Sequence, residues 1–423
     1  MGMFPPPGFV PGKSTVEGIE VFVPAPVEVE ARKPVMDFKC PNCGATTAYS
    51  AADGGLRCEH CGYYEAPKRE IVGKGAEEFE FKVETLALAA QGWGQSRREL
   101  QCQNCGAATS LPDTALAYTC PFCGSNKVIQ REASQDVLRP RFLVPFRVTI
   151  ENCLVAARQW LGSSWMVPVD LQRLAALAGF TSIYIPFWTF DAVATAGWKA
   201  EVGHTESERY YDDGEWKTRT RTVWRWESGN VRLTFDDVLT AGTARISHVL
   251  LPQIQEYDLQ QLVPYEPSYL AGHHAQAYDI PLEPAWETAR QQMREETRTA
   301  CHDQASTSQT RNFSMSLDFS AESWRYILLP VYLTVYKYQD KAYQVIINGQ
   351  TGAVGGQRPV DWTKVWLVLA AILAPGLLLS LAGLVTFFTG IGVVVAIVGF
   401  VLLIVGLIVD VVLFNTAQEL DKA

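Results

Sequence analysis

The sequence predicts an α+β protein in which two small cysteine-rich modules precede a mixed body and a pair of apolar helices follows it. Three observations lead to this fold class. Cysteine pairs spaced Cys-x-x-Cys occur four times in the first third of the chain. Two stretches in the middle repeat each other as a strand that leads into a helix. No charged residue occurs from Val365 to Val409. With 423 residues, the chain has room for two or three domains.

Each cysteine-rich module contains two Cys-x-x-Cys pairs separated by fourteen residues. The tight turn at each pair brings two sulfur atoms to one ion, and two such turns complete a tetrahedral site. Gly44 and Gly62 follow the pairs of the first module and suit the positive φ of these turns. We therefore predict two zinc ribbons with one structural Zn²⁺ ion each. The predicted ligands are Cys40, Cys43, Cys58 and Cys61 in the first ribbon and Cys102, Cys105, Cys120 and Cys123 in the second.

Three other roles for these thiols remain open. Disulfides would need an oxidising compartment, and the start of the chain, MGMFPPPGFV, lacks the charged and apolar regions of a signal peptide. A rubredoxin-like iron site accepts the same kind of turn, but the short spacer favours zinc. A redox dithiol would need only one pair. His60 is expected to face solvent, whereas Cys153 and Cys301 are expected to be buried as small hydrophobic side chains.

Composition and turn residues divide the chain into seven segments. They are a proline-rich tail predicted to be disordered (1–35), the first ribbon (36–66), a connector (67–100), the second ribbon (101–131), an α+β body (140–358), a helical hairpin (362–414) and a short tail (415–423). In the connector, the alternation of apolar and charged residues from Glu78 to Val83 predicts a strand. The net charge of −9 argues against a broad surface for polyanions.

The body contains a fainter internal repeat. FRVTIENCLVAARQ (146–159) aligns with YDIPLEPAWETARQ (278–291), and IYIPFWTF (183–190) aligns with ILLPVYLT (327–334). Each copy is typical of a strand that leads into a helix and then into further strands. We therefore predict two α+β repeats, at about 142–226 and 276–356, packed into one module.

One stretch of the first repeat, KTRTRTVWRW (217–226), interleaves basic residues with tryptophan, as surfaces for single-stranded nucleic acid do. Asp213-Gly214 before it is a favoured two-residue hairpin turn. The register that follows from this turn pairs Glu208 with Arg219 and Glu206 with Arg221. Cross-strand ion pairs would then neutralise the basic face, so a structural role is the preferred interpretation.

The uncharged run near the C-terminus is long enough for two membrane spans of roughly 20 residues each. Thr389-Gly390 divides it into helices near 365–388 and 391–413, with no charged residue expected inside either span. Arg358 and Lys364 precede the first helix, so the positive-inside rule places both termini in the cytoplasm.

Glycines recur every seven residues in both predicted spans. They are Gly376, Gly383 and Gly390 in the first stripe and Gly392, Gly399 and Gly406 in the second. Stripes of the smallest side chain let two helices approach closely. We expect them to pack the hairpin against itself, and a homo-oligomer formed through them is the alternative.

The chain contains none of the common catalytic signatures. The P-loop, H-E-x-x-H and G-x-S-x-G motifs are absent. His273-His274 and Cys301-His302-Asp303 have no third group at metal-ligand spacing and are expected to be ordinary surface residues. The sequence therefore predicts a protein that is not an enzyme.

Short sequence words follow one another in a consistent order through residues 38–360. They are CPNCGA, CPFCGS, LVPF (143–146), IPFWTFDA (185–192), FDDVL (235–239), PYEPSYLAG (264–272), LLPVYL (328–333) and NGQTGAVGG (348–356). In these words the chain resembles a family of prokaryotic double zinc-ribbon membrane proteins, which carry the labels TFIIB-type zinc-ribbon protein or primosomal replication helicase. The helicase label does not fit, because the ATPase motifs are absent. The resemblance implies an association with membrane-stress systems that contain phage-shock-type or SPFH proteins.

These observations together predict a membrane-anchored cytoplasmic adaptor or scaffold. Its ribbons and body would mediate protein–protein interactions at the membrane, and the resemblance implies a partner of the phage-shock or SPFH type. Binding of nucleic acid is not expected, because residues 1–148 hold 16 Lys and Arg against 17 Asp and Glu. A membrane-tethered nucleic-acid-binding protein is the alternative function.

Overall fold

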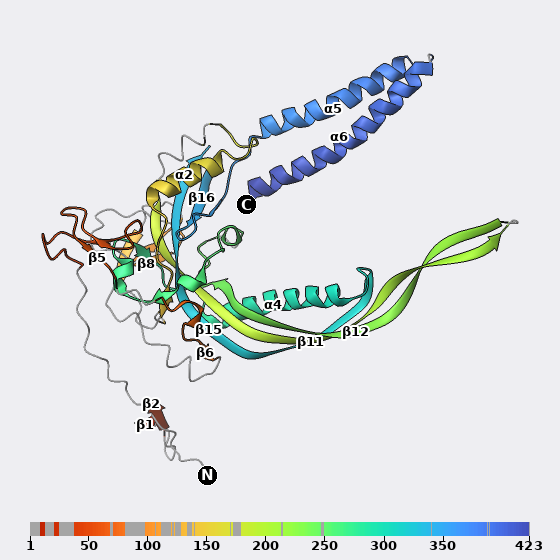
Figure 1. Cartoon of the computed structure of the whole chain (residues 1–423). Coiled ribbons are helices and arrows are strands. Elements are labelled where there is room, and N and C mark those ends of the chain that lie inside the picture. The colour runs from red at the N-terminus through yellow and green to blue at the C-terminus, as the bar shows by residue number, and fades with distance from the viewer. Residues whose placement is uncertain are drawn as a thin grey trace, which may run out of the picture.

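The protein consists of a mixed sheet with helices packed against it and a separate helical hairpin (Figure 1). The structure is a computed structural model. It describes residues 9–12, 21–24, 38–67, 71–80, 98–105, 107–110, 120, 122, 128–132, 138, 140–169, 171, 179–212, 215–246, 249–339, 341–386, 388 and 390–422. The predicted α+β class and the pair of apolar C-terminal helices are both confirmed.

The elements follow one another along the chain in this order. The strands are β1 (Phe9–Gly12), β2 (Val21–Pro24), β3 (Ala48–Ser50), β4 (Gly55–Arg57), β5 (Tyr64–Glu65), β6 (Phe79–Glu80), β7 (Arg98–Cys102), β8 (Ala108–Ser110), β9 (Val128–Glu132), β10 (Phe142–Leu143), β11 (Thr181–Asp212), β12 (Glu215–Ala241), β13 (Val263–Pro264), β14 (His274–Ala275), β15 (Thr310–Tyr338), β16 (Lys341–Asn348) and β17 (Val354–Gly356). The helices are α2 (Ile150–Leu161), α4 (Leu282–Gln304), α5 (Trp362–Val385) and α6 (Gly390–Lys422), with the short 3-10 helices η1 (Gly73–Gly75), η2 (Leu251–Gln253), η3 (Leu259–Gln261) and η4 (Pro267–Leu270).

The two strands that the sequence aligns lie side by side at the centre of the main sheet. β11 and β15 pair antiparallel, and Ile185 lies opposite Leu329, the residue that the alignment equates with it. β10 runs parallel to β15, and β14 runs parallel to β11. The helices α2 and α4 begin at the aligned residues Ile150 and Leu282. These positions agree with the sequence alignment, and the internal repeat stays a prediction.

The two halves differ in the hairpin that follows each central strand. β15 turns back into the short strand β16, whereas β11 and β12 continue far beyond the body. The last residue of β11 paired with β15 is Val202, opposite Thr310. Beyond it, residues 203–212 pair only with residues 215–224 among the described residues, and we call this two-stranded ribbon the arm. It extends from the body as a twisted ribbon in Figure 1.

The predicted register of the arm is confirmed, with Glu208 opposite Arg219 and Glu206 opposite Arg221. The turn residues 213–214 lie outside the described residues. Arg219 forms the expected ion pair with Glu208 at 2.9 Å, but Glu206 pairs with Arg225 instead of Arg221. The prediction failed for that pair because it considered only directly opposite residues, whereas Arg225, four residues from Arg221 on the same face, reaches Glu206 with its long side chain.

Helix α4 covers one face of the long strands before the arm begins. Under its C-terminal half lie Ala196, Trp198, Ala200 and Val202, each at most 5% exposed, together with the fully buried Cys301. Trp198 also donates a hydrogen bond from Nε1 to Gln304 Oε1 at 2.6 Å. Because both the helix and the third strand end near Val202, the arm continues without their support.

Aromatic side chains fill the core of the body on the inner face of β11 and β15. The indole of Trp188 is fully buried and contacts the rings of Tyr278, Trp324 and Tyr326 at centroid distances of 5.2, 5.9 and 5.0 Å. Cys153 on α2 lies in the same core cluster and is fully buried, as predicted. Burial raises the pKa of its thiol to about 12, so it is an inert packing group.

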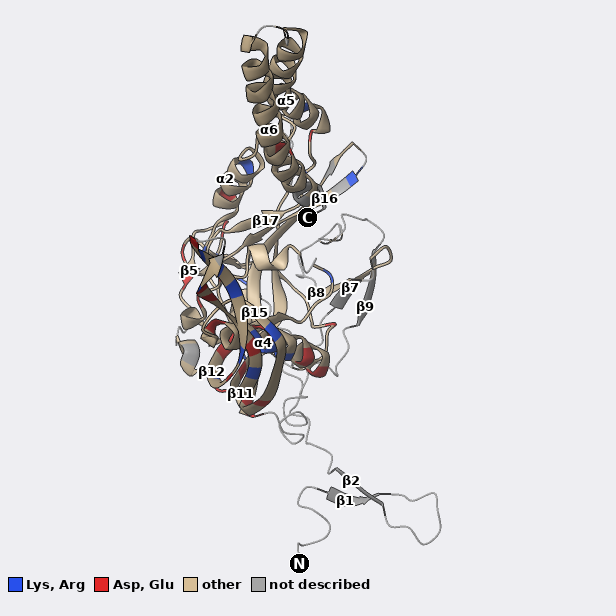
Figure 2. Ribbon diagram, turned by 90° about the vertical axis from the view of Figure 1, so that its right-hand side faces the viewer, with Lys and Arg blue, Asp and Glu red and all other residues tan. Residues whose placement is uncertain are grey.

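Helices α5 and α6 form the predicted apolar hairpin. Both are long and apolar enough to cross a bilayer, over Trp362–Val385 and Gly390–Gln418. In Figure 2 the ribbon coloured for charged residues lies mainly on the body and the arm, whereas the hairpin is almost free of such residues. α6 continues to Lys422, through most of the segment predicted to be a short tail.

Four glycines of the stripes, Gly376, Gly383, Gly399 and Gly406, face the other helix of the same hairpin. A Cβ on Gly383 would lie 2.3 Å from the backbone nitrogen of Ala396, and one on Gly399 would lie 2.3 Å from that of Ser380. The expectation that neither span contains a charged residue is wrong. Asp410 lies within the α6 span, because apolar residues resume after it and the helix continues. Its side chain is 8% exposed.

Two short segments of the N-terminal third add to this description. Residues 9–12 and 21–24, predicted to belong to a disordered tail, pair instead as the antiparallel strands β1 and β2. β6 lies within the predicted strand Glu78–Val83, of which residues 81–83 lie outside the described part. β6 pairs with β15, so the connector between the ribbons is attached to the main sheet.

Candidate metal centres

The first ribbon is a three-stranded antiparallel sheet, β3–β4–β5, that carries two cysteine turns. The four sulfur atoms of Cys40, Cys43, Cys58 and Cys61 all lie within 4.8 Å of one another. Cys40 Sγ is 3.3 Å from Cys61 Sγ, and Cys43 Sγ is 3.6 Å from Cys58 Sγ. A tetrahedral ion bonded to thiolates at about 2.3 Å would hold them roughly 3.8 Å apart. The four thiols are therefore placed to bind one metal ion.

The backbone of both turns has the predicted conformation. Gly44 and Gly62 have φ values of +73° and +74°. Their amides donate hydrogen bonds to the carbonyl oxygens of Cys40 and Cys58, both at 2.9 Å. No atom lies within 4 Å of a Cβ built on either glycine, so the backbone conformation and not lack of space requires glycine here. His60 is exposed, as predicted.

The backbone also favours ionisation at one ligand. Burial of the Cys40 thiol opposes ionisation, but hydrogen bonds from the backbone amides of Asn42 and Cys43 and from the thiols of Cys61 and Cys43 together outweigh it and lower the pKa of Cys40 to about 7. Metal binding requires deprotonated thiols, so a thiol that already ionises near neutral pH favours it.

One face of the first ribbon docks on the body. Tyr49 of β3 is 4% exposed, packs against the ring of Tyr269 at 5.3 Å, and donates its backbone N–H to Ala271 O at 2.9 Å. The close approach needs Gly272, where a Cβ would lie 2.8 Å from the Cβ of Ala48 and the φ is +80°. The turn that holds Cys58 and Cys61 lies away from this contact and has mostly exposed residues.

The second ribbon shows the same cluster in its described part. The sulfur atoms of Cys102, Cys105 and Cys120 lie within 4.8 Å of one another, with Cys105 and Cys120 3.6 Å apart. Cys123, the fourth predicted ligand, lies outside the described residues. β7 pairs with β8 and β9, and β8 pairs with β14, so this ribbon extends the main sheet. The first ribbon, in contrast, is a separate small sheet.

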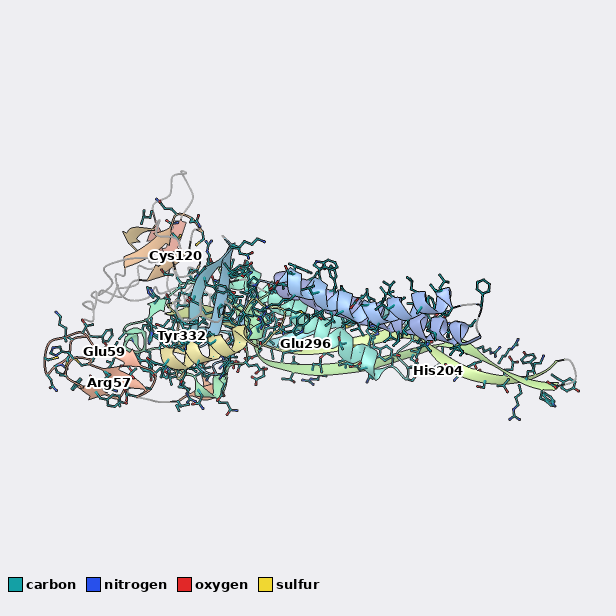
Figure 3. All side chains as sticks on the ribbon, turned by 90° about the horizontal axis from the view of Figure 1, so that it is seen from above. Arg57, Glu59, Cys120, His204, Glu296 and Tyr332 are labelled. Atoms are coloured by element: carbon teal, nitrogen blue, oxygen red, sulfur yellow. The ribbon has the colours of Figure 1, made fainter. Side chains whose placement is uncertain are left out.

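Both ribbons lie at the end of the body opposite the arm and the helical hairpin. Figure 3 shows Cys120 of the second ribbon apart from Arg57 and Glu59 of the first, with His204 and the helices toward the other end. The molecule is therefore elongated, with its thiol clusters at one end.

A buried arginine holds a group of carboxylates that the sequence analysis did not single out. Arg325 of β15 is 1% exposed and pairs with Asp237 and with Glu78, the latter at 3.2 Å. Asp191 lies 3.9 Å from the same guanidinium nitrogen, and burial raises the pKa of its carboxyl to about 7. Asp237 has a φ of +59°, at the bulge opposite Asp191. The signal in the sequence was the presence of aspartates within two otherwise apolar segments, Asp191 in IPFWTFDA and Asp236 and Asp237 in FDDVL.

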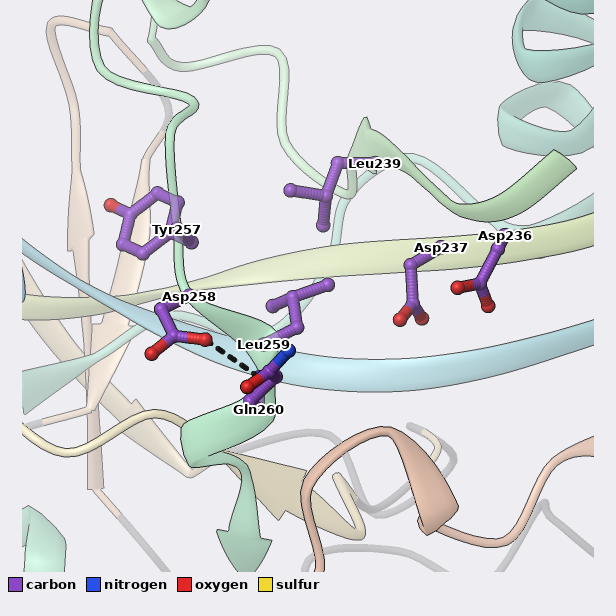
Figure 4. Close-up of a pocket in the computed structure, with 7 residues that line it drawn as sticks. All are labelled: Asp236, Asp237, Leu239, Tyr257, Asp258, Leu259 and Gln260. Carbon is purple, nitrogen blue, oxygen red and sulfur yellow. Dashed lines mark hydrogen bonds between the residues drawn. The ribbon is translucent and has the colours of Figure 1, made fainter.

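An open pocket of about 260 Å³ lies beside this cluster (Figure 4). It is lined by Asp236, Asp237, Leu239, Tyr257, Asp258, Leu259 and Gln260. Oxygen atoms of Asp191, Asp236 and Asp237 can approach within 4.8 Å of one another, but Arg325 already supplies a cation to this group. Through its ion pairs Arg325 links β15 to β12 and to the connector, so we assign the cluster a structural role.

The expectation that the histidine motifs are ordinary surface residues is wrong for His273. Its ring stacks on Phe146 at 4.5 Å, and its Nδ1 lies 2.7 Å from Ser182 Oγ. Burial lowers the pKa of His273 to about 4, so it is neutral at physiological pH. Its neighbours come from distant parts of the chain, which local sequence does not reveal. His302 likewise stacks on Phe313, at 4.0 Å.

Ser306, His204 and Glu227 meet at the root of the arm, but they do not form a nucleophilic triad. His204 Nε2 lies 3.0 Å from Glu227 and 3.5 Å from Ser306 Oγ, while Ser306 donates to Glu227. A triad needs one ring nitrogen for the serine and the other for the carboxylate. Here one nitrogen faces both, so the three residues fasten the chain between α4 and β15 to the root of the arm.

Comparison with known proteins gives one relative. The chain is similar to the uncharacterized protein YdjG of Bacillus subtilis (strain 168), with 25% identity over 336 residues, which make up 78% of this chain and 92% of the relative. No protein-family model matches the chain, and no solved structure matches it. The similarity extends over nearly the whole relative, so the two proteins share more than a ribbon.

Proposed function

We propose that the protein is a membrane-anchored cytoplasmic adaptor that presents its metal ribbons to a protein partner. One observation carries the proposal: the thiol clusters lie at one end of an elongated body and the apolar helical hairpin leaves from the other (Figures 1 and 3). An anchor at one end and an exposed cysteine turn at the other would hold a partner close to the bilayer. A non-enzymatic role is part of this proposal.

The metal in this proposal is Zn²⁺, one ion in each ribbon. Four thiolates at the spacing found in the first ribbon suit zinc and leave no open coordination position for a substrate. The ion would have a structural role, because it joins two turns that a three-stranded sheet this small cannot hold together alone. The residues between Cys58 and Cys61, Glu59 and His60, are exposed and would contact the partner.

The membrane part of the proposal rests on the chemistry of the hairpin and its flanks. Leucine, valine and isoleucine side chains on α5 and α6 are exposed all along the hairpin, as they would be in contact with lipid. Arg358 and Lys364 stand at the start of α5 and bond to carbonyl oxygens of Trp160 and Val167 on the body. Basic residues on the body side favour a cytoplasmic body, with both termini on that side.

The second candidate is a membrane-tethered protein that binds nucleic acid through KTRTRTVWRW. The structure weakens its electrostatic basis, because Arg219 and Arg225 are engaged by Glu208 and Glu206. Binding to a single strand would show a log–log salt slope of about 0.7 per neutralised phosphate. Binding of this kind, lost on Arg219→Glu combined with Arg221→Glu, would favour this candidate.

The adaptor proposal can be tested by cross-linking the full-length protein in nuclease-treated native membranes and identifying what co-purifies. The decisive variant reverses exposed charge at the cysteine turn, with Glu59→Lys and His60→Glu. The matched control is Glu296→Lys on the exposed side of α4. We expect the turn variant to keep its metal and lose the cross-linked protein, and the control to keep both.

Two results would contradict the adaptor. Capture that is the same for the wild type and both variants would show that the ribbon does not present the binding surface. Capture that depends on leaving out the nuclease would favour the nucleic-acid candidate.

A further inference from the structure

The arm has two faces of different chemistry, which follow from its register. Residues directly opposite in an antiparallel ladder share a face. One face continues the side covered by α4 and carries the charged residues Glu206, Glu208, Glu215, Lys217, Arg219 and Arg221, with Arg225 adjoining it at the root. The other, which we call the aromatic–hydroxyl face, carries Thr205, Ser207, Arg209, Tyr211, Trp216, Thr218, Thr220, Thr222 and Trp224, with Trp226 adjoining it at the root.

The aromatic–hydroxyl face exposes large rings at both of its ends. Trp216 and Tyr211 near the tip are 73% and 62% exposed, and Trp226 at the root is 61% exposed. The Tyr211 and Trp216 rings contact each other edge to face at 5.2 Å. Between the two ends the face consists of hydroxyl side chains, with Arg209 as its charged residue. An isolated two-stranded ribbon is marginally stable in water, so rings left exposed on it point to an occupant.

The charges on the arm distinguish between the possible binding partners of the aromatic–hydroxyl face. A nucleic acid would need several cations beside the rings, whereas this face has Arg209, and Arg311, which lies over the Trp224 ring at 4.1 Å, is paired with Glu201. A second copy of the arm paired through the same edge strand, β12 with β12 or β11 with β11, can set Arg219 opposite Arg221, or Glu206 opposite Glu208, of its partner. Such like-charge pairs are unfavourable. The interfacial region of a bilayer suits the pattern, because tyrosine and tryptophan concentrate there and hydroxyl groups hydrogen-bond to lipid headgroups.

We propose that the aromatic–hydroxyl face of the arm lies on the lipid interface of the membrane in which the same chain is anchored. The inference rests on the anchoring proposed above, which brings a bilayer to the side of the body from which the arm extends (Figures 1 and 3). The arm is roughly 30 Å long at about 3.3 Å per residue, enough to span several lipid headgroups.

The arm and the helical hairpin leave the body in the same general direction, but the arm cannot cross hydrocarbon beside the helices. Its other face carries six charged side chains among the described ones, and these are costly at membrane depth. The proposal therefore requires the arm to bend toward the surface at its root, where the third strand ends at Thr310. There Ser306, His204 and Glu227 hold the segment that follows α4, so the bend begins beyond that contact.

The test uses full-length protein in phosphatidylcholine vesicles with a photo-cross-linking residue, p-benzoylphenylalanine, at single positions. Position 220 lies on the aromatic–hydroxyl face, and position 221 lies on the charged face one residue further along. Position 397, on an exposed part of α6, reports anchoring. We expect lipid adducts at positions 397 and 220 and few at 221. The yield at 220 should fall about tenfold on Tyr211→Ser combined with Trp216→Ser, because the rings supply most of the apolar contact.

Each outcome decides the inference. Adducts at 397 without adducts at 220 would overturn the membrane contact of the arm and leave the anchor standing. The absence of adducts at both positions would overturn the anchor as well. Equal yields at 220 and 221, or an unchanged yield in the ring variant, would contradict the assigned face.

Discussion

Replacement of Arg325 by methionine is expected to destabilise the body strongly at neutral and higher pH. Arg325 is 1% exposed, and its guanidinium is the cation for Asp237 and Glu78, with Asp191 at 3.9 Å. Methionine fills much of the same volume but leaves these carboxylates without their counter-charge. Removing one partner of a buried ion pair costs about 3–5 kcal/mol, and roughly 3 °C of melting temperature is lost per kcal/mol in a domain of this size. We therefore expect the melting temperature to fall by roughly 10 °C.

The loss should depend on pH, and its sign follows from Asp191. Burial raises the pKa of this carboxyl to about 7 in the folded protein, from an unfolded value near 3.9. The folded state thus binds the proton more tightly, and the stability associated with the protonated form is lost as pH rises through this window. Without Arg325 the neighbouring carboxylates repel one another more, so the variant should be weakest at about pH 8 and closer to the wild type at about pH 5.

The assay is thermal unfolding of the full-length protein in detergent, followed by near-ultraviolet circular dichroism. Arg219→Met is the matched control, because it breaks an ion pair whose side chains are 60% and 43% exposed. Exposed pairs contribute about 0–1 kcal/mol, so this control should melt close to the wild type. If Arg325→Met melts within about 2 °C of the control at pH 8, or loses more stability at pH 5 than at pH 8, the assigned role of the buried cluster is refuted.

Three further predictions concern the metal and the hairpin. Elemental analysis of the purified protein should find two zinc ions per chain. The variant Cys58→Ser should lose one ion and keep the other, since each ribbon closes on its own ion. Iron, or one metal ion per chain in the wild type, would contradict this. Gly399→Ala should lower the stability of the hairpin in detergent, because its Cβ would lie 2.3 Å from the backbone of Ser380, whereas Gly390→Ala meets no atom within 4 Å and should be tolerated. Asp410→Leu should stabilise the hairpin by about 2 kcal/mol in a denaturant titration. The reason is that it replaces a buried carboxyl whose Oδ1 has no hydrogen-bond partner within the described structure. A loss of stability would indicate that the carboxyl has a partner in the membrane.

Features set by neighbouring residues could be predicted from the sequence. The Cys-x-x-Cys spacing and the glycines after it specify turns of a few residues, and the first ribbon has the predicted thiol cluster and positive φ values. The register of the arm followed from a two-residue turn, because a tight hairpin leaves one way to pair the strands. The apolar helices could be recognised because their signal is continuous along the chain.

The tertiary structure alone decided which distant residues meet. Arg325 and Asp191 lie on paired strands but 134 positions apart in the chain, so no local pattern marked them as a buried pair. The ring of His273 stacks on Phe146, and Glu206 pairs with Arg225 and not with the residue directly opposite it. The length of the arm was also hidden, because it depends on where α4 and β15 stop supporting β11. In each case the energy comes from contacts across the fold, which spacing along one segment does not record.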